Sequence, residues 1–229
     1  MSGSAPARVS VPQACQHGRM NCPPSRSTVS SEAWDLRYRS EGFWFGDKPN
    51  GWLAKHASHW SSGAHVLCVA DGEGRNSVWL AQQGLRVDAF DPSSVGMAKA
   101  AELAASRGVC VNFTVADCDS YCWPHGSVDG VAAIFIQFAD PRMRERLFQR
   151  MVDSLRPGGV MVLQGYTVAQ LAYGTGGPPC ASHLYTRDLL LGLLPDMEIL
   201  ALEEYEADLA EGAGHLGRSA LVGLVARKP

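Results

Sequence analysis

The stretch of sequence that decides the fold is residues 65–91, HVLCVADGEGRNSVWLAQQGLRVDAFD. Its apolar start, residues 66–70, predicts a buried strand, and the apolar spacing over residues 76–83 predicts a helix. Gly72 and Gly74 stand between the two, and glycine permits backbone conformations that other residues adopt with difficulty. The stretch therefore predicts a strand, a glycine loop and a helix.

A second apolar run, residues 85–90, ends on an acid, Asp91. This order is typical of the first half of a nucleotide-binding βαβ unit. The glycines let the backbone approach a ligand, the start of the helix offers unpaired N–H donors, and the acid can accept bonds from both ribose hydroxyls. The pattern therefore predicts an adenosine-type cofactor.

The details of the loop indicate which cofactor. The dinucleotide fingerprint has a third glycine where this chain has Ser77, which weakens an NAD interpretation. Asp71 and Glu73 place two acids in the loop, and acids suit a cationic ligand better than a pyrophosphate. S-adenosylmethionine carries an ammonium and a sulfonium, so it is the preferred cofactor. A simple glycine-containing turn between two core elements is the open alternative.

Composition narrows the class of protein. The 229 residues are 46% hydrophobic with a formal net charge of −3, which predicts one globular domain and disfavours a nucleic-acid partner. The longest apolar runs, residues 131–136 and 189–194, are too short to span a membrane. We therefore expect a cytoplasmic protein without a membrane partner, and the sequence does not indicate its oligomeric state.

The seven cysteines show no paired spacing of the zinc-binding kind. Cys118 and Cys122 are separated by three residues, but no second pair accompanies them. We expect no metal site and interpret the cysteines as reduced intracellular thiols.

Residues 1–29 are rich in Pro and Ser, contain no acid and show no apolar periodicity, so we expect a flexible leader. An organelle transit peptide and translation from Met20 are the alternatives. The folded domain is expected over residues 30–229. Its first segment, about residues 31–60, is rich in aromatic side chains and is interpreted as a lid over the cofactor; a hydrophobic plug is the alternative.

The remaining chain alternates strands with helices. Such alternation builds a doubly wound, Rossmann-like α/β fold with a mostly parallel sheet and helices on both faces. Ligands of such sheets lie at the carboxyl ends of the strands. The further strands are expected at residues 111–115, 128–137, 160–164, 198–203 and 220–226, the last two joined by a hairpin-length linker, residues 207–218.

Several separated motifs resemble class I S-adenosylmethionine-dependent methyltransferases over roughly residues 31–229. The motifs are Val66 to Asn76, Asp91, Asp117, the LRPGG at residues 155–159 and the final strand pair. Phe45-Gly46 with Pro49-Asn50, the GEGRN loop at residues 72–76 and the YGTGGP at residues 173–178 resemble the tellurite-resistance or thiopurine-like branch of that family.

The resemblance implies a seven-stranded sheet with an antiparallel last strand. It also implies that the loop from Ala70 through Asp71, Gly72 and Glu73 to Gly74 binds the methionine moiety, that Asp91 binds the ribose, and that Asp117 with Cys118 binds the adenine. The expected cofactor set further includes Asn76, Pro92, Ser93 and Gln137. Cys68 and Ala70 depart from the family's usual acid and glycine, and Asp71 is expected to replace the acid. The alternative role for Asp117 or the neighbouring Asp119 is to cap the next turn.

A methyl group on a sulfonium is already activated, so a soft acceptor such as a thiol or chalcogenide needs little base catalysis. The acceptor is expected to be a small molecule. The walls of its pocket are expected to come from Phe43, Trp44 and Phe45 on one side and from Tyr173, Gly176 and Gly177 on the other; a flexible surface loop is the alternative for residues 173–178.

No residue is a compelling general base. Gln137, Tyr173 and His183, with Tyr166, are weak catalytic candidates because they flank the predicted mouth of the sheet. The alternatives to an enzyme are a non-catalytic S-adenosylmethionine-binding or regulatory protein and, after that, an NAD-dependent dehydrogenase.

Overall fold

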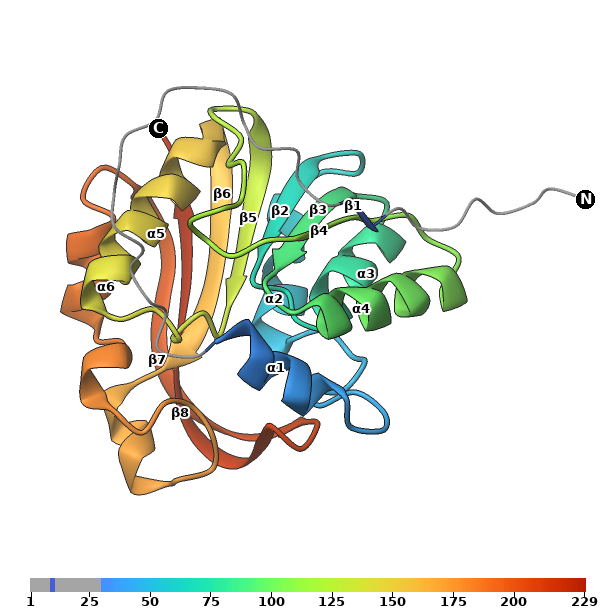
Figure 1. Cartoon of the computed structure of the whole chain (residues 1–229). Coiled ribbons are helices and arrows are strands. Elements are labelled where there is room, and N and C mark those ends of the chain that lie inside the picture. The colour runs from blue at the N-terminus through green and yellow to red at the C-terminus, as the bar shows by residue number, and fades with distance from the viewer. Residues whose placement is uncertain (1–8, 11–29) are drawn as a thin grey trace, which may run out of the picture.

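One sheet of eight strands runs through the molecule in the order β1-β4-β3-β2-β5-β6-β8-β7 (Figure 1). The computed structural model describes residues 9–10 and 30–229. The strands are β1 (Val9–Ser10), β2 (His65–Val69), β3 (Arg86–Asp91), β4 (Asn112–Val115), β5 (Val128–Ile134), β6 (Leu155–Tyr166), β7 (Glu198–Glu211) and β8 (His215–Arg227).

The seven predicted strands correspond to β2 through β8. Strand β8 is antiparallel to both of its neighbours, β6 and β7, whereas the pairs from β4 to β6 are parallel. The predicted mostly parallel sheet with an antiparallel last strand is therefore confirmed. Within the predicted leader, the structure describes only the two residues of β1, which pair in parallel with β4; residues 1–8 and 11–29 lie outside the described residues.

The helices begin at polar caps that the sequence supplies. They are α1 (Ser31–Tyr38), α2 (Gly51–His56), α3 (Arg75–Gln82), α4 (Ser94–Ser106), α5 (Pro141–Ser154) and α6 (Arg187–Leu193), with short 3-10 turns at Ala57–His59, Val168–Ala172 and Ala181–His183. The side chains of Asn50, Ser93 and Asp140 each accept a bond from a backbone N–H of the following first turn. Such caps satisfy donors that a helix start leaves unpaired.

Helices cover both faces of the sheet (Figure 1). Side chains alternate along β2: Leu67 and Val69 pack into a core with α5 and α6, whereas Val66 and Cys68 pack into a second core with α2, α3 and α4. This alternation is the period of two that a strand imposes. The near-continuous apolar sequence of the central strands follows from their burial on both faces.

Several predicted boundaries were wrong, and the following ones lie near the carboxyl ends of the parallel strands. Strand β5 ends at Ile134 rather than at Gln137, because Phe135 turns the chain with a left-handed φ of 55°. The linker predicted over residues 207–218 is itself mostly strand, since β7 continues to Glu211 and β8 starts at His215. The long hairpin carries its tip to the carboxyl ends of the parallel strands, beside α1 (Figure 1).

No helix in the described part of the chain is both long enough and apolar enough to cross a membrane. Among the cysteines, Cys68, Cys110, Cys118 and Cys180 are free, as expected. Cys122 is the exception, because it is disulfide-bonded, so the expectation of a thiol was wrong there.

Candidate active site

A cavity of about 880 Å³ opens at the carboxyl ends of β2, β3, β4 and β5. The chain leaves β2 to build β3 and β4 on one side and returns to build β5 and β6 on the other. A crevice forms where the strand order reverses in this way, and it is the usual ligand site of open α/β sheets. The volume is within the range of small-molecule and cofactor pockets.

The glycine loop after β2 forms the floor of the cavity. Ala70 has a left-handed φ of 50° and Gly72 a φ of 65°. A Cβ atom on Gly72 would lie 2.8 Å from the Tyr38 hydroxyl oxygen, so this position requires glycine for space as well as for conformation. Ala70 stands where the resembled family has glycine, and its positive φ explains that preference.

Asp91 lies at the end of β3 and is buried. Its Oδ2 accepts a hydrogen bond from the Gly72 N–H at 3.0 Å, and its Oδ1 accepts one from the Ser93 N–H at 2.9 Å. Burial raises the pKa of this carboxyl to about 7, although both bonds favour the ionised form. Asp91 therefore links the floor of the cavity to the start of α4 and lines the cavity itself.

Asp71 is the second acid on the floor. Its Oδ2 accepts a bond from the Ser77 hydroxyl, and Ser77 is the residue that replaces the third glycine of the dinucleotide fingerprint. Burial, opposed by Ser77 and reinforced by the charge of Asp91, raises the pKa of Asp71 to about 7. Two buried carboxyls that are costly to ionise make a favourable site for a positive charge.

Three residues predicted to bind the cofactor are directed elsewhere. Glu73 is buried, accepts the Trp44 N–H at 2.7 Å and pairs with Lys99. Gly74 packs against α4, where a Cβ would lie 2.6 Å from that of Ala100. Ser93 caps α4 and donates its hydroxyl to Asp35 of α1. None of Glu73, Gly74 and Ser93 lines the cavity, whereas Asn76 and Pro92 do.

The predicted adenine pair lies at the end of β4. Asp117 and Cys118 both line the cavity, Cys118 buried and Asp117 exposed. However, Oδ1 of Asp117 accepts bonds from the N–H groups of Asp119 and Ser120 and from the Ser120 hydroxyl. This is the turn-capping role that was the alternative for Asp117, so only its other carboxylate oxygen is left for a ligand.

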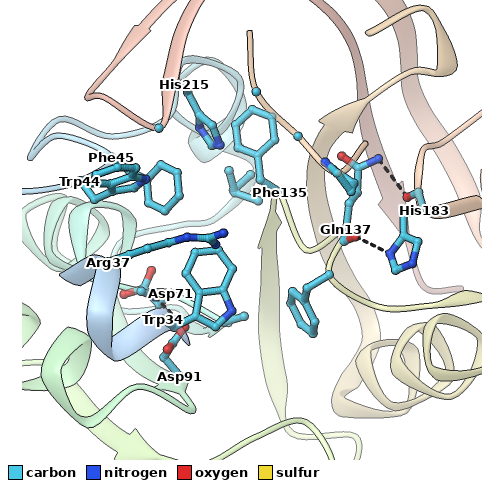
Figure 2. Close-up of a pocket in the computed structure, with 18 of the residues that line it drawn as sticks. Trp34, Arg37, Trp44, Phe45, Asp71, Asp91, Phe135, Gln137, His183 and His215 are labelled. Atoms are coloured by element: carbon cyan, nitrogen blue, oxygen red, sulfur yellow. Dashed lines mark hydrogen bonds between the residues drawn. The ribbon is translucent and has the colours of Figure 1, made fainter. Parts of the chain in front are cut away.

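Helix α1 forms a lid over the floor. Trp34 and Tyr38 stack with ring centroids 5.6 Å apart, and Phe45 lies 6.4 Å from the Tyr38 ring. Arg37, which lies over the Trp34 ring at 4.5 Å, extends into the same space (Figure 2). Trp34, Arg37, Tyr38, Trp44 and Phe45 all line the cavity. Aromatic side chains from the segment that was interpreted as a lid therefore line the cavity.

Phe43 is the exception among the predicted aromatic residues, because it does not line the cavity. Its ring packs against the core beneath α4, with the Lys99 ammonium 5.2 Å from the ring centroid. The lid backbone itself is tied to the hairpin tip, since the Gly214 N–H donates to the Trp44 carbonyl at 3.1 Å.

The opposite wall comes from β6, the segment after β5 and the hairpin tip. Gly176 and Gly177 line the cavity as predicted and pack on the Tyr166 ring. Phe135 lies 4.8 Å from that ring, and His215 enters from the hairpin between Phe135 and Phe45 (Figure 2). The Tyr166 hydroxyl is buried and lacks a hydrogen-bond partner among the described residues.

Besides Tyr166, the other three weak catalytic candidates differ in placement. Gln137 is buried and clamped by both ends of its amide, donating to the Tyr166 carbonyl at 2.8 Å and accepting the Tyr166 N–H at 2.6 Å. His183 lines the cavity with Nδ1 2.9 Å from the Gln137 carbonyl oxygen (Figure 2). Tyr173 lies outside the cavity, where interaction with Glu206 raises the pKa of its hydroxyl. Tyr173 is therefore not a residue of the cavity wall.

Sequence reasoning missed Arg37, Arg75, Phe135 and His215 as cavity residues. Trp34, Arg37 and Tyr38 stand at the spacing of one helical face, which is a signal that could have found Arg37. Continuing the alternation of β8 back from its apolar core would have placed His215 on an inner face. Phe135 carried no such signal, because its place depends on a backbone turn. In the described part of the chain, no three His, Cys, Asp or Glu residues are grouped to hold a metal ion.

Comparisons with known proteins agree with this geometry. A family model described as "Methyltransferase domain" matches residues 66–159, and no curated protein matches the chain. A solved SAM-dependent methyltransferase from Methanosarcina mazei is 19% identical, with 75% of this chain and 95% of that chain covered at a TM-score of 0.64.

Two further solved structures are similar to this chain. TehB from Haemophilus influenzae is 16% identical, with 87% of this chain and 67% of that chain covered at a TM-score of 0.64. N-methyltransferase NodS from Bradyrhizobium japonicum WM9, in complex with S-adenosyl-L-homocysteine, is 12% identical. The match covers 87% of this chain and 98% of that chain at a TM-score of 0.64. The chain has the fold of the S-adenosylmethionine-dependent methyltransferases, and its residues 66–159 match a methyltransferase domain.

Proposed function

We propose that this protein transfers the methyl group of S-adenosylmethionine to a small-molecule acceptor with a soft nucleophile, such as a thiol or chalcogenide. The observation that carries the proposal is the pair Asp71 and Asp91 on the floor of an aromatic-lidded cavity. The pKa of each carboxyl is raised to about 7 in the protein without ligand. A ligand with a positive charge and a ribose diol would favour the ionised form of both.

We assign the parts of the cavity to the parts of that cofactor. The loop from Ala70 to Gly72, with Asp71 and Asn76, would hold the methionine moiety and its ammonium. Asp91 would accept the ribose hydroxyls, and the pocket end at Asp117 and Cys118 would take the adenine. Each of these side chains lines the cavity.

Arg37 supplies a partner for the remaining charge. It forms no ion pair with any described residue, and it lines the cavity from α1. An unpaired guanidinium beside a pocket suits a carboxylate, which it can bind with two parallel hydrogen bonds. We therefore assign Arg37 to the cofactor carboxylate.

When bound, the cofactor supplies a methyl group that its sulfonium has already activated for displacement. The protein has to hold the acceptor in line with that group and keep water out. Trp34, Tyr38 and Phe45 close the cavity with aromatic faces, which attract a cation and exclude water. Such positioning is worth on the order of 7–11 kcal/mol at best.

The acceptor chamber is apolar, which supports a small, soft acceptor. Trp44, Phe45, Phe135 and the Tyr166 ring surround it, and Gly176 and Gly177 close it without adding side chains. The Tyr166 hydroxyl, His215 and Arg75 are polar groups on its hairpin side. A nucleophile that is poorly solvated in such a chamber reacts faster than the same group in water.

A non-catalytic cofactor-binding protein is the second candidate, and the left-handed Ala70 is the observation that favours it. A strained alanine in place of glycine lowers stability in the loop that holds the cofactor. An NAD-dependent dehydrogenase is disfavoured, because Ser77 is committed to Asp71 and two acids face the position of a pyrophosphate.

Calorimetric titration with S-adenosylhomocysteine tests cofactor choice, and a parallel titration with NADH tests the dehydrogenase. We expect binding of S-adenosylhomocysteine alone, weakened at least tenfold by Asp91→Ala and unchanged by Asp196→Ala, an exposed control. Release of S-adenosylhomocysteine in the presence of thiols, selenite or tellurite then tests turnover. Binding without release for every acceptor would favour the non-catalytic candidate, and no binding at millimolar ligand would reject the proposal.

A further inference from the structure

His215 is a buried histidine at the tip of the β7–β8 hairpin, only 6% exposed. Its ring lies between aromatic rings, with centroid distances of 4.5 Å to Phe45 and 4.1 Å to Phe135. Figure 2 shows the ring directed from the hairpin into the cavity. A polar ring in such an apolar setting needs a reason, because burying it costs free energy.

The carboxylate of Glu211, at the end of β7, lies beside the His215 ring. Oε2 of Glu211 lies 3.7 Å from Nδ1 of His215, just beyond a hydrogen bond, and Nδ1 has no other partner among the described residues. The same carboxylate is held in place by Arg75 at 2.8 Å and by the Asn50 amide at 3.1 Å. Glu211 is thus fixed beside one nitrogen of the ring.

The charge of Glu211 is well defined. Burial raises the pKa of its carboxyl, but the interactions with His215 and Arg75 outweigh burial and lower that pKa to about 2. An anion beside Nδ1 favours the tautomer that carries the proton on Nδ1. In that tautomer, Nε2 has the free lone pair and is an acceptor.

We propose that His215 is the general base for acceptors that are protonated at neutral pH, and that Glu211 is its positioning residue. This inference rests on the proposed function, and it assigns the group that would remove the proton from a thiol acceptor. The aromatic side chains around the His215 ring, Phe45, Phe135 and Tyr166, cannot accept a proton from a thiol at neutral pH.

Nε2 of His215 takes the proton of the acceptor S–H group, and the sulfur electron pair attacks the methyl carbon. The bond from that carbon to the cofactor sulfonium breaks, and its electron pair remains on the cofactor sulfur, which becomes a neutral thioether. The imidazolium then returns its proton to solvent, and no oxidant or further reactant is consumed.

The surroundings of His215 keep its base form available. Burial and the charge of Arg75 lower the pKa of the ring, and Glu211 raises it, with a net lowering from 6.5. The groups that face it are Glu211 from β7, Arg75 from α3 and the Tyr166 hydroxyl from β6, whose pKa burial raises. The imidazole is therefore neutral at the pH where a base is needed.

The kinetic test compares two thiols that each carry one benzene ring. 4-Nitrothiophenol is largely ionised at neutral pH, whereas benzyl mercaptan is protonated. We expect His215→Asn to lower kcat on benzyl mercaptan by 10²- to 10⁴-fold and to lower kcat on 4-nitrothiophenol far less, since general base catalysis contributes about that much. His125→Asn, at an exposed site outside the cavity, is the matched control. Equal losses on both thiols would show a structural role and overturn the proposal.

Glu211→Gln gives a second test that does not depend on the stability of the His215 variant. Removing the anion should lower the pKa of His215, so the acid limb of the pH profile of kcat/KM on benzyl mercaptan should shift to lower pH while the plateau falls. An unshifted limb would contradict the pairing.

The tautomer of His215 can be measured without any acceptor, by long-range ¹H–¹⁵N correlation spectra of the wild type and His215→Asn at pH 7.5. We expect a neutral ring with its proton on Nδ1. A proton on Nε2, or a doubly protonated ring, would overturn the proposal even if no thiol is methylated. Absence of turnover on both thiols together with the expected tautomer would instead count against the proposed function.

Discussion

The Lys99 ammonium binds the buried Glu73 carboxylate, and this pair joins the glycine loop to the lid. Lys99 extends from α4 and also donates to the carbonyl oxygens of Tyr38 at 3.0 Å and Ser40 at 3.3 Å. Glu73 in turn accepts the Trp44 N–H. One ion pair therefore fixes the chain on both sides of the aromatic lid, which explains why Glu73 is not available to a ligand.

Replacing one partner of the Lys99–Glu73 pair should lower the free energy of unfolding more than replacing both partners does. Lys99→Met leaves a buried carboxylate unpaired, and we expect a loss of about 3 kcal/mol in the free energy of unfolding. Adding Glu73→Gln to Lys99→Met should recover more than half of that loss. Urea denaturation of the two single variants and the double variant measures the coupling.

Lys55→Met is the matched control, because Lys55 forms an ion pair with Glu203 in which both side chains are more than half exposed. We expect it to cost less than about 1 kcal/mol. Equal costs for the Lys55 and Lys99 variants, or no recovery in the double variant, would contradict the buried role of Glu73.

Replacing Ala70 by glycine should affect stability less adversely than replacing an alanine with ordinary backbone angles. A φ of 50° destabilises the folded state by about 1–2 kcal/mol for a residue with a Cβ. Glycine removes that strain, but it raises the entropy of the unfolded chain, which lowers the free energy of unfolding by about 0.5–1 kcal/mol. We expect Ala70→Gly to raise the free energy of unfolding by about 0.5 kcal/mol and to retain affinity for S-adenosylhomocysteine. Ala133→Gly, in the buried interior of β5, should instead lose at least about 1 kcal/mol. A similar loss in both variants would show that Ala70 is not strained.

The elements of this fold were predictable because their signals are local. Apolar runs and glycine breaks marked all seven strands β2 to β8, and the acid at the end of β3 marked a cavity residue. The pairing of strands followed from connection rules. The antiparallel β8 came from the family resemblance rather than from the residues.

The directions of individual side chains were not predictable, because they depend on partners distant in sequence. Glu73 is turned away from the cavity by Lys99, and Ser93 by its role as the cap of α4. Phe43 packs on the core, and Tyr173 lies outside the cavity with Glu206 and Arg218. His215 reaches the site because β7 and β8 extend beyond their apolar portions into residues 207–218, which the sequence predicts to be a linker.

Affinity for S-adenosylhomocysteine should weaken as pH falls below about 7. The ribose hydroxyls would donate to ionised Asp91, and the pKa of that carboxyl is about 7 in the protein without ligand. Binding at lower pH therefore has to expel a proton, which raises Kd by roughly tenfold per pH unit for one such group. Calorimetry between pH 5 and 8 measures the slope.

Asp91→Asn is the control for that slope. The variant should bind the ligand more weakly at pH 8, and its Kd should depend less on pH. The pH dependence that remains should come from Asp71. The free energy of unfolding should change with pH in the opposite direction to ligand affinity. The raised pKa of Asp91 stabilises the folded protein at low pH, and this stability is lost as pH rises from 3.8 to about 7. A slope that is the same in the wild type and Asp91→Asn would remove Asp91 from the ribose site.

The glycine pair of the loop after β6 should control turnover rather than cofactor binding. Gly176 has a φ of 153° and Gly177 a φ of 79°, and added Cβ atoms would lie 2.8 Å from the Tyr166 hydroxyl oxygen and 2.7 Å from a carbon of its ring. Alanine at both positions therefore has to displace the Tyr166 ring or the loop itself, and either change alters the acceptor chamber. We expect turnover of a thiol acceptor to fall at least tenfold, whereas Kd for S-adenosylhomocysteine changes less than threefold. Gly174→Ala, at a φ of 63° with open space around its Cβ, is the matched control for backbone strain alone. Equal kinetics in the double variant and the Gly174 variant would place the acceptor on another wall of the cavity.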